Sequence, residues 1–280
     1  MFRNKGKIRA QKIIMYGFLL CMILITTFPI IWMVNSSLKD VTEIYRMPPT
    51  FSISNITFSS YYRVLFESGI PRAFLNSVIV SVTATSITVI LGSLAGYGFS
   101  RFRMKGKRVF YIGLLYGQMM PSVVLIIPIF TLFSKVGLIN NYFSLILPYV
   151  AITIPLSTLM LKTFFDGIAF ELEEAARIDG ATRLRTFVSV VVPIARPGLM
   201  SVAIYTFLST WEEFVLALNL TTSANVRTLP IAINMFVGEY LVDWGAIMAS
   251  GVVISLPIIL LFILCNKVFV KGLSEGGVKG

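Results

Sequence analysis

The sequence predicts an all-α membrane protein, a polytopic bundle of six transmembrane helices. Apolar residues make up 56% of the 280 residues. Charged residues make up only 13%, about half of their share in a soluble domain. Apolar stretches long enough to cross a bilayer recur six times along the chain. Basic residues collect in alternate loops between these stretches, as in multi-pass membrane proteins.

The apolar stretches define the organisation of the chain, because a helix needs about 20 residues to cross the hydrocarbon core. We expect a basic amino-terminal segment at 1–12, a single transmembrane domain at 13–270 and a tail at 271–280. The first apolar stretch is too long for the core of a signal peptide, and no small-x-small cleavage pattern follows Trp32, so we expect it to be retained. The predicted spans are 13–34, 75–99, 109–133, 142–165, 198–220 and 246–270, with a connecting loop at 166–197.

Proline and glycine occur inside these spans. Membrane helices tolerate proline when neighbouring groups satisfy the freed carbonyl. Gly92 and Gly96 in the second span, and Gly113 and Gly117 in the third, have the small-xxx-small spacing that lets helices approach closely. These pairs favour a packed bundle. The prolines within spans are Pro29, Pro121, Pro128, Pro148, Pro155 and Pro257.

The charge of the loops predicts the orientation. The segment before the first span and the loop after the second each carry five basic residues and no acid. The loops after the third and fifth spans carry one basic residue each, Lys135 and Arg227. Because cytoplasmic loops are enriched in Lys and Arg, we expect both termini in the cytoplasm. The same pattern explains the net charge of +11 without a nucleic-acid partner.

The residue inventory argues against an enzyme. Histidine is absent, which removes the usual general base and the commonest metal ligand. Cys21 and Cys265 lie inside apolar stretches and read as buried apolar residues. No phosphate-binding loop is present, because Gly106-Lys107 is followed by arginine rather than Ser or Thr. We therefore expect no catalytic residues, no metal and no cofactor.

The loop at 166–197 is the most informative part of the chain. Helix-forming residues predict a short helix over Phe170–Ile178. Gly180 can end it in a left-handed conformation. Thr182 can cap a second helix that runs toward Val192 and ends at Pro193. We expect two short helices joined by a tight turn.

The first of these helices has two possible roles. Ala175 and Ala176 form a small-residue face that another protein can approach closely, and Glu174 offers a carboxylate that a partner arginine could hold. The alternative is a surface helix lying among the lipid headgroups.

At these residues the sequence resembles a known family. Three residues separate Glu174-Ala175-Ala176 from Gly180, and nine more separate Gly180 from Val190-x-Val192-Pro193. This arrangement is similar to the EAA loop, E-A-A-x3-G-x9-I-x-L-P, of binding-protein-dependent ABC importer permeases. Valine replaces isoleucine and leucine. Asp179 completes the common D-G-A form.

Two further stretches resemble the carbohydrate permeases of the maltose-transporter type. Trp211-x-Glu213-Phe214 resembles a W-N-E-F segment, with Glu212 in place of asparagine. The tail from Gly272 to Gly280 resembles the G-L-T-x-G-x-V-K-G ending of MalG-like subunits. The resemblance extends from Phe28-Pro29 to this tail.

The resemblance implies a type I ABC importer permease fold in a bacterial or archaeal cytoplasmic membrane. It implies a heterodimer with a homologous second permease, two copies of a cytoplasmic ATPase, and an extracytoplasmic binding protein that delivers a sugar. It further implies a coupling contact with the ATPase. The residues of that contact would be Glu174, Ala175, Ala176, Asp179, Gly180 and Pro193.

Several alternatives stay open. Trp211, Glu212 and Glu213 could line a translocation pathway, since carboxylates inside membrane spans usually face a cavity or a partner. They could equally form structural hydrogen bonds between helices. The solute could be something other than a sugar. An ion-coupled secondary transporter would use the intramembrane carboxylates as proton sites.

Overall fold

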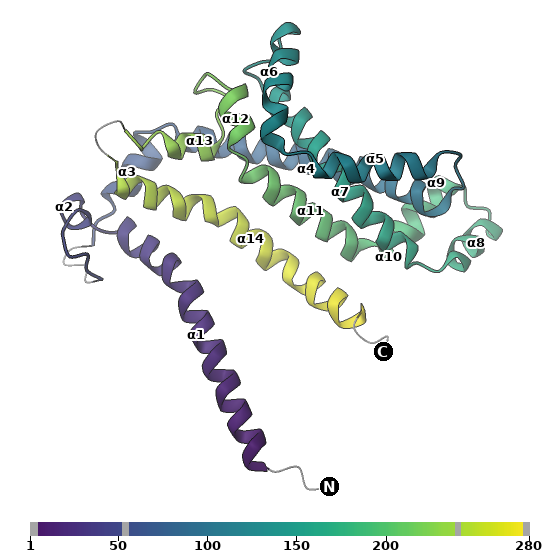
Figure 1. Ribbon diagram of the computed structural model, residues 1–280, viewed down its shortest axis with the longest axis horizontal. Coiled ribbons are helices and arrows are strands. Elements are labelled where there is room, and N and C mark those ends of the chain that lie inside the picture. Colours follow the sequence, from purple (N-terminus) through teal and green to yellow (C-terminus); the bar gives the residue numbers. More distant parts are fainter. Residues whose placement is uncertain (1–4, 52–55, 239–241, 277–280) are drawn as a thin grey trace. The chain divides into compact units, whose positions relative to one another are not determined.

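The computed structural model describes residues 5–51, 56–238 and 242–276, with side chains for 11–51, 56–238 and 242–265. Within them every regular element is a helix (Figure 1), and the sole β-pairing is an isolated bridge between Val237 and Val242. The predicted all-α fold is confirmed. Among the described residues, four helices are long and apolar enough to cross a membrane, and the number reaches the expected six if each of two bent pairs is one span.

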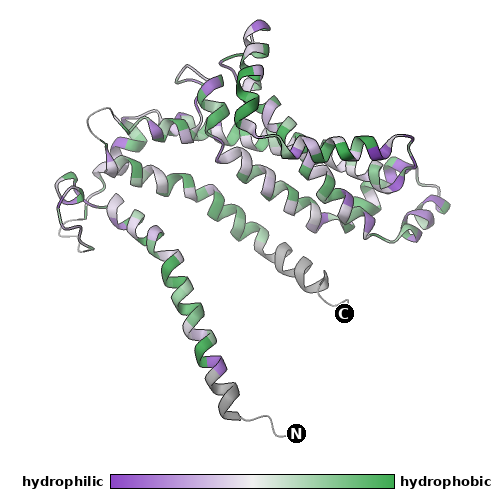
Figure 2. Cartoon of the chain, viewed as in Figure 1, coloured by the Kyte–Doolittle hydropathy of each residue, from purple (hydrophilic) through white to green (hydrophobic). Residues whose placement is uncertain are grey.

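The chain divides into two units, Met1–Ile70 with Ile233–Ser255 and Pro71–Ala232 with Leu256–Gly280. The first unit contains α1 (Lys5–Ser37), α2 (Val41–Ile44), α3 (Ser59–Phe66) and the beginning of α14 (Trp244–Gly276). Figure 2 shows apolar residues along most of the described part of α1. Its most apolar window contains no buried residue, as expected for a helix that faces lipid.

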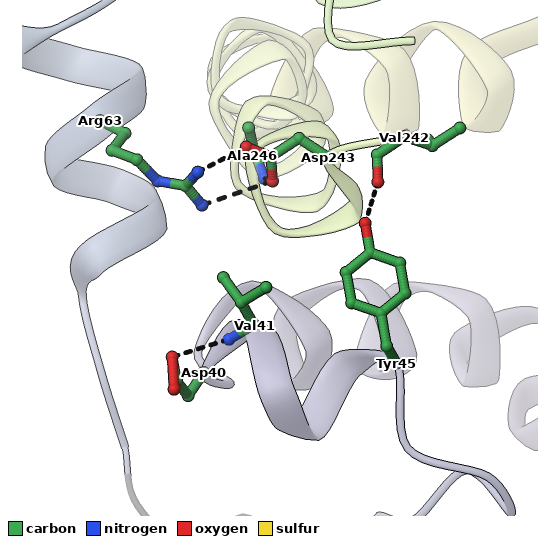
Figure 3. A network of polar contacts seen from close by, with 7 residues as sticks. All are labelled: Asp40, Val41, Tyr45, Arg63, Val242, Asp243 and Ala246. Atoms are coloured by element: carbon green, nitrogen blue, oxygen red, sulfur yellow. Dashed lines mark hydrogen bonds and ion pairs between the residues drawn. The ribbon is translucent and has the colours of Figure 1, made fainter. Parts of the chain in front are cut away.

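Polar contacts in the first unit join the segment after α1 to the start of α14 (Figure 3). Arg63 holds Asp243 through both terminal nitrogens, at 2.6 and 3.3 Å. Asp243 Oδ1 also accepts the backbone N–H of Ala246 at 3.0 Å, which caps the first turn of α14. The Tyr45 hydroxyl donates to the carbonyl of Val242. The side chains thereby fix the entry into the last long helix.

The second unit is built on α4 (Ile70–Arg101), α7 (Phe143–Asp166) and α11 (Arg196–Trp211). A Cβ on Gly96 would lie 3.0 Å from the backbone nitrogen of Lys162, and one on Gly92 would lie 3.4 Å from Ser157. This glycine pair therefore lets α4 and α7 approach closely, as predicted. Gly113 of the second pair faces open space.

The predicted third span, 109–133, is not one continuous helix. It consists of α5 (Lys107–Met119), a 3-10 turn (Ser122–Leu125) and α6 (Ile126–Lys135), with a bend of 95° between the two parts. Pro121 explains the break, because the residue before a proline is driven out of the helical region. Met120 is extended, with ψ 123°.

The predicted fifth span, 198–220, is also interrupted. α11 ends at Trp211, and α12 covers Val215–Leu220. The Glu213 carboxylate accepts the N–H groups of Leu216 and Ala217 at 2.8 and 3.0 Å, so it starts a new helix rather than continuing the old one. A further short helix, α13, covers Leu229–Asn234.

Candidate functional site

The first short helix of the 166–197 loop is α8, which covers Phe170–Ile178 as predicted. It ends in a Schellman motif. Gly180 has φ +86°, its N–H donates to the carbonyl of Arg177 at 3.1 Å, and the Ala181 N–H donates to the carbonyl of Ala176 at 3.0 Å. The predicted left-handed glycine is confirmed.

The second half of the loop begins as predicted and ends differently. Thr182 caps α9 (Arg183–Thr186), its hydroxyl accepting the Arg185 N–H at 3.3 Å. A π-helical turn, η2 (Phe187–Val191), and α10 (Val192–Ile194) follow. The helical stretch ends at Ile194, one residue beyond the predicted end at Pro193. The chain bends by 79° at Ala195 before α11.

α8 presents one continuous face to the outside. Glu171, Glu174, Ala175 and Ile178 are all exposed and are spaced i, i+3, i+4 and i+7, which places them on one side of a helix. Ile178 is 85% exposed. Ala176 is half-buried beside this face, so the small-residue patch predicted from the two alanines is mainly Ala175. Asp179 and Gly180 are exposed at the end of the helix, and Pro193 is exposed on α10.

The opposite side of α8 is tied to the end of α4 by a buried glutamate. Glu173 is 3% exposed. Its carboxylate accepts hydrogen bonds from Arg101 Nε and from the Tyr97 hydroxyl, both at 2.6 Å. Arg101 also donates to the carbonyl of Ile168 at 2.8 Å. These charge-assisted contacts fix α8 to α4.

Sequence reasoning missed Glu173 and selected its exposed neighbour Glu174. One signal was available. Phe170, Glu173 and Arg177 recur at helical spacing, and the loop after the second span is rich in arginine and lysine.

An aromatic cluster holds the second half of the loop. Phe187 is 7% exposed, and its ring lies 4.7 Å from that of Tyr97 and 6.1 Å from that of Phe165. These rings belong to η2, α4 and α7 respectively. Both halves of the loop are therefore packed against the long helices.

The Trp211–Glu213 segment lies apart from this loop, at the other end of α11. The Trp211 ring stacks on Phe207 at 5.4 Å and meets Phe74 edge-on at 5.7 Å. Glu213 accepts a hydrogen bond from the Tyr149 hydroxyl at 2.7 Å in addition to its two backbone contacts. These contacts favour a structural role for Glu213 over a role in a translocation pathway. Glu212 is exposed.

Residues 88–275 match the protein family described as "Binding-protein-dependent transport system inner membrane component". The chain belongs to this family. The resemblance inferred from the EAA loop is thereby confirmed, and the matched region contains all of α8, α9, η2 and α10.

Curated relatives of this inner membrane component align over nearly its full length. The "Probable ABC transporter permease protein YurM" of Bacillus subtilis is 35% identical over 94% of this chain and 87% of its own. The "Trehalose/maltose transport system permease protein MalG" of Thermococcus litoralis is 36% identical, covering 92% and 94%. The "Sulfoquinovosyl glycerol transport system permease protein SmoH" of Agrobacterium fabrum is 34% identical, covering 90% and 89%. The resemblance to the maltose-transporter type is confirmed.

A solved structure shares the fold of this inner membrane component. It is a chain of a bacterial ABC transporter "involved in the import of the acidic polysaccharide alginate", with a TM-score of 0.82 and 22% identity over 95% of this chain and 99% of that chain. The predicted type I importer permease fold is confirmed.

Proposed function

We propose that this protein is the permease subunit of an ATP-driven importer of a sugar or oligosaccharide. The relatives named for trehalose/maltose and for sulfoquinovosyl glycerol transport support a carbohydrate substrate. Because the chain has no phosphate-binding loop, ATP is hydrolysed by partner subunits. The membrane is the cytoplasmic membrane of a bacterium or archaeon.

The exposed face of α8 carries this proposal. Glu171, Glu174, Ala175 and Ile178 form a surface with two carboxylates, a small residue and an apolar side chain. Glu173 fixes this surface rigidly to α4 from behind. An arginine of the ATPase can hold the Glu174 carboxylate, while Ala175 lets the two backbones approach. One ATPase copy docks here, and a second docks on the homologous permease.

The loop charges support the orientation. With the arginine-rich loop after α4 in the cytoplasm, both termini are cytoplasmic, and the segment 221–244 lies outside. We expect this segment to contact the extracytoplasmic sugar-binding protein; residues 239–241 lie outside the described residues. The carboxy-terminal tail, of which 277–280 lie outside the described residues, would reach the ATPase dimer.

Transport then follows from a coupled movement. ATP brings the two ATPase subunits together, and α8 moves with the subunit that holds it. Because Glu173 and Phe187 join the loop to α4 and α7, these helices move with α8. The two permeases thereby alternate between inward-facing and outward-facing states.

The Glu174→Arg variant tests the coupling contact. It reverses a charge on the exposed face without touching the buried contacts of Glu173, so the protein should still reach the membrane. We expect binding-protein-stimulated ATP hydrolysis and sugar uptake to be lost in the reconstituted complex. The sugar used in the uptake measurement is chosen as the one on which cells lacking this chain stop growing.

Glu67→Arg is the matched control, because Glu67 is also exposed but follows α3 in the other unit. It should leave uptake and ATP hydrolysis unchanged. Uptake retained in Glu174→Arg would remove the coupling role of α8. Uptake that survives loss of ATP but collapses with the ion gradient would remove the ATP-driven importer itself.

A further inference from the structure

A basic cavity lies between the end of α4, α8 and α9. Its volume is about 230 Å³, and four arginines contribute to its wall, together with Tyr97, Phe102, Phe170, Glu173 and Thr186. We call it the arginine pocket. A single water occupies about 30 Å³ of liquid, so the cavity has room for a larger polar group. The four arginines are Arg101, Arg103, Arg177 and Arg183.

The wall of the arginine pocket carries a net positive charge. Glu173 is the one carboxylate in its wall and is engaged by Arg101. Four guanidinium groups against one carboxylate leave a net charge of +3. Among the residues with described side chains, none of Arg103, Arg177 and Arg183 forms an ion pair.

Two further contacts shape the arginine pocket. The Arg183 guanidinium lies 5.1 Å from the centre of the Phe102 ring, a cation–π contact that orients the charge. Thr186 is 1% exposed, and its hydroxyl oxygen has no hydrogen-bond partner in the described part of the chain. Buried hydroxyl groups without a partner are uncommon in folded proteins. A bound group with several acceptor oxygens would satisfy both the arginines and this hydroxyl.

The position of the arginine pocket indicates where that group comes from. Arg101 is the last residue of α4, a helix long and apolar enough to cross the membrane. Phe170, in the pocket wall, and Leu184, which follows Arg183 in α9, are 46% and 67% exposed. Guanidinium groups at the end of a span, flanked by exposed apolar side chains, are suited to the headgroup layer, where apolar parts meet lipid and charged groups meet phosphate. Basic pockets beside transmembrane helices are suited to anionic headgroups.

We propose that the arginine pocket binds the phosphate group of an anionic phospholipid. The guanidinium groups of Arg103, Arg177 and Arg183 would hold the phosphate oxygens, and Arg101 would remain with Glu173. The bound lipid would brace α8 and α9 against the end of α4. This inference uses the proposed membrane orientation only in placing the pocket at the headgroup layer, and it does not depend on the transported solute.

The double variant Arg103→Gln, Arg183→Gln tests the site. The full-length chain is purified with the subunits that accompany it, in nanodiscs of phosphatidylcholine containing phosphatidylglycerol, and the retained phosphatidylglycerol is counted by native mass spectrometry. We expect about a 30-fold loss of affinity, from two arginines at about 1 kcal/mol each. The control is Lys105→Gln, Lys107→Gln, which removes the same amount of charge from residues close to Arg103 in the chain but outside the pocket wall.

The outcomes separate the alternatives. A loss confined to the pocket variant supports the proposal. Equal losses in both double variants would show a non-specific surface effect and overturn it. Displacement of the lipid by millimolar inorganic phosphate would overturn the lipid assignment in favour of a soluble phosphate. Reduced recovery of the ATPase with unchanged lipid would make the pocket a protein-docking surface. Transport lost in Glu174→Arg bears on the proposed function alone, because that residue does not line the pocket.

Discussion

Two adjacent glutamates of α8 should differ sharply in their contribution to stability. Glu173 is buried against Arg101 and Tyr97, whereas Glu174 is exposed. The perturbation is Glu173→Ala, which removes the acceptor of both hydrogen bonds and leaves the Arg101 charge at a buried position. The side chains of Arg101 and Glu173 are only 11% and 4% exposed, so solvent replaces little of what is lost.

The loss of stability expected for Glu173→Ala depends on the contacts that Arg101 keeps. Removing one partner of a buried ion pair typically costs about 3–5 kcal/mol. Arg101 keeps two hydrogen bonds, to the Ile168 carbonyl at 2.8 Å and the Ser100 hydroxyl at 3.2 Å. We therefore expect the lower end of the range, about 3 kcal/mol. In a double-mutant cycle with Arg101→Ala, the coupling energy should be about 2 kcal/mol.

The assay is unfolding of the purified chain by sodium dodecyl sulfate in mixed micelles, followed by intrinsic fluorescence. Glu174→Ala is the control and should leave the free energy of unfolding almost unchanged, because surface substitutions away from buried contacts have small effects. If Glu173→Ala destabilised the protein no more than Glu174→Ala, the buried contact would not hold α8, and the reasoning would be refuted.

Three other contacts give further predictions. Gly96→Ala should lower the free energy of unfolding by about 1–2 kcal/mol in the same assay, because its Cβ would meet the backbone of α7 at 3.0 Å. Gly98→Ala is the control and should be neutral, because its Cβ would meet only a side chain at 4.0 Å. Equal stabilities of the two variants would contradict this packing. Glu213→Gln should weaken α12 by about 1 kcal/mol, measured as faster amide exchange there, and unchanged exchange would argue against the cap. Asp243→Asn should lower stability by about 1 kcal/mol and reduce its salt dependence, since the contact with Arg63 is partly exposed; unchanged salt dependence would contradict a contribution from this pair.

The parts of the 166–197 loop that could be predicted are those set by local chemistry. The helix formers of α8, the left-handed Gly180 and the capping Thr182 each act within a few residues of one another. The position of α8 in the chain and the way it ends were therefore readable from sequence. The burial of Glu173 depends on Arg101, 72 residues away. No local pattern determines such a contact.

The effect of proline on the membrane-spanning helices could also not be predicted from the local sequence. Pro29 and Pro257 lie inside continuous helices, whereas Pro121 separates two helices that meet at 95°. The residue is identical in each case. The difference lies in how neighbouring segments satisfy the backbone groups that proline leaves unpaired. It depends on tertiary contacts, which the local sequence does not determine.

The attachment of α8 to the last residue of α4 has a mechanical consequence. α4 contains 32 residues, and at 1.5 Å per residue it is a rod of about 48 Å. A tilt of about 10° imposed at the end that carries Arg101 would displace the opposite tip by roughly 8 Å. A small rotation at one end of α4 would thus become a displacement of several ångströms at the other end.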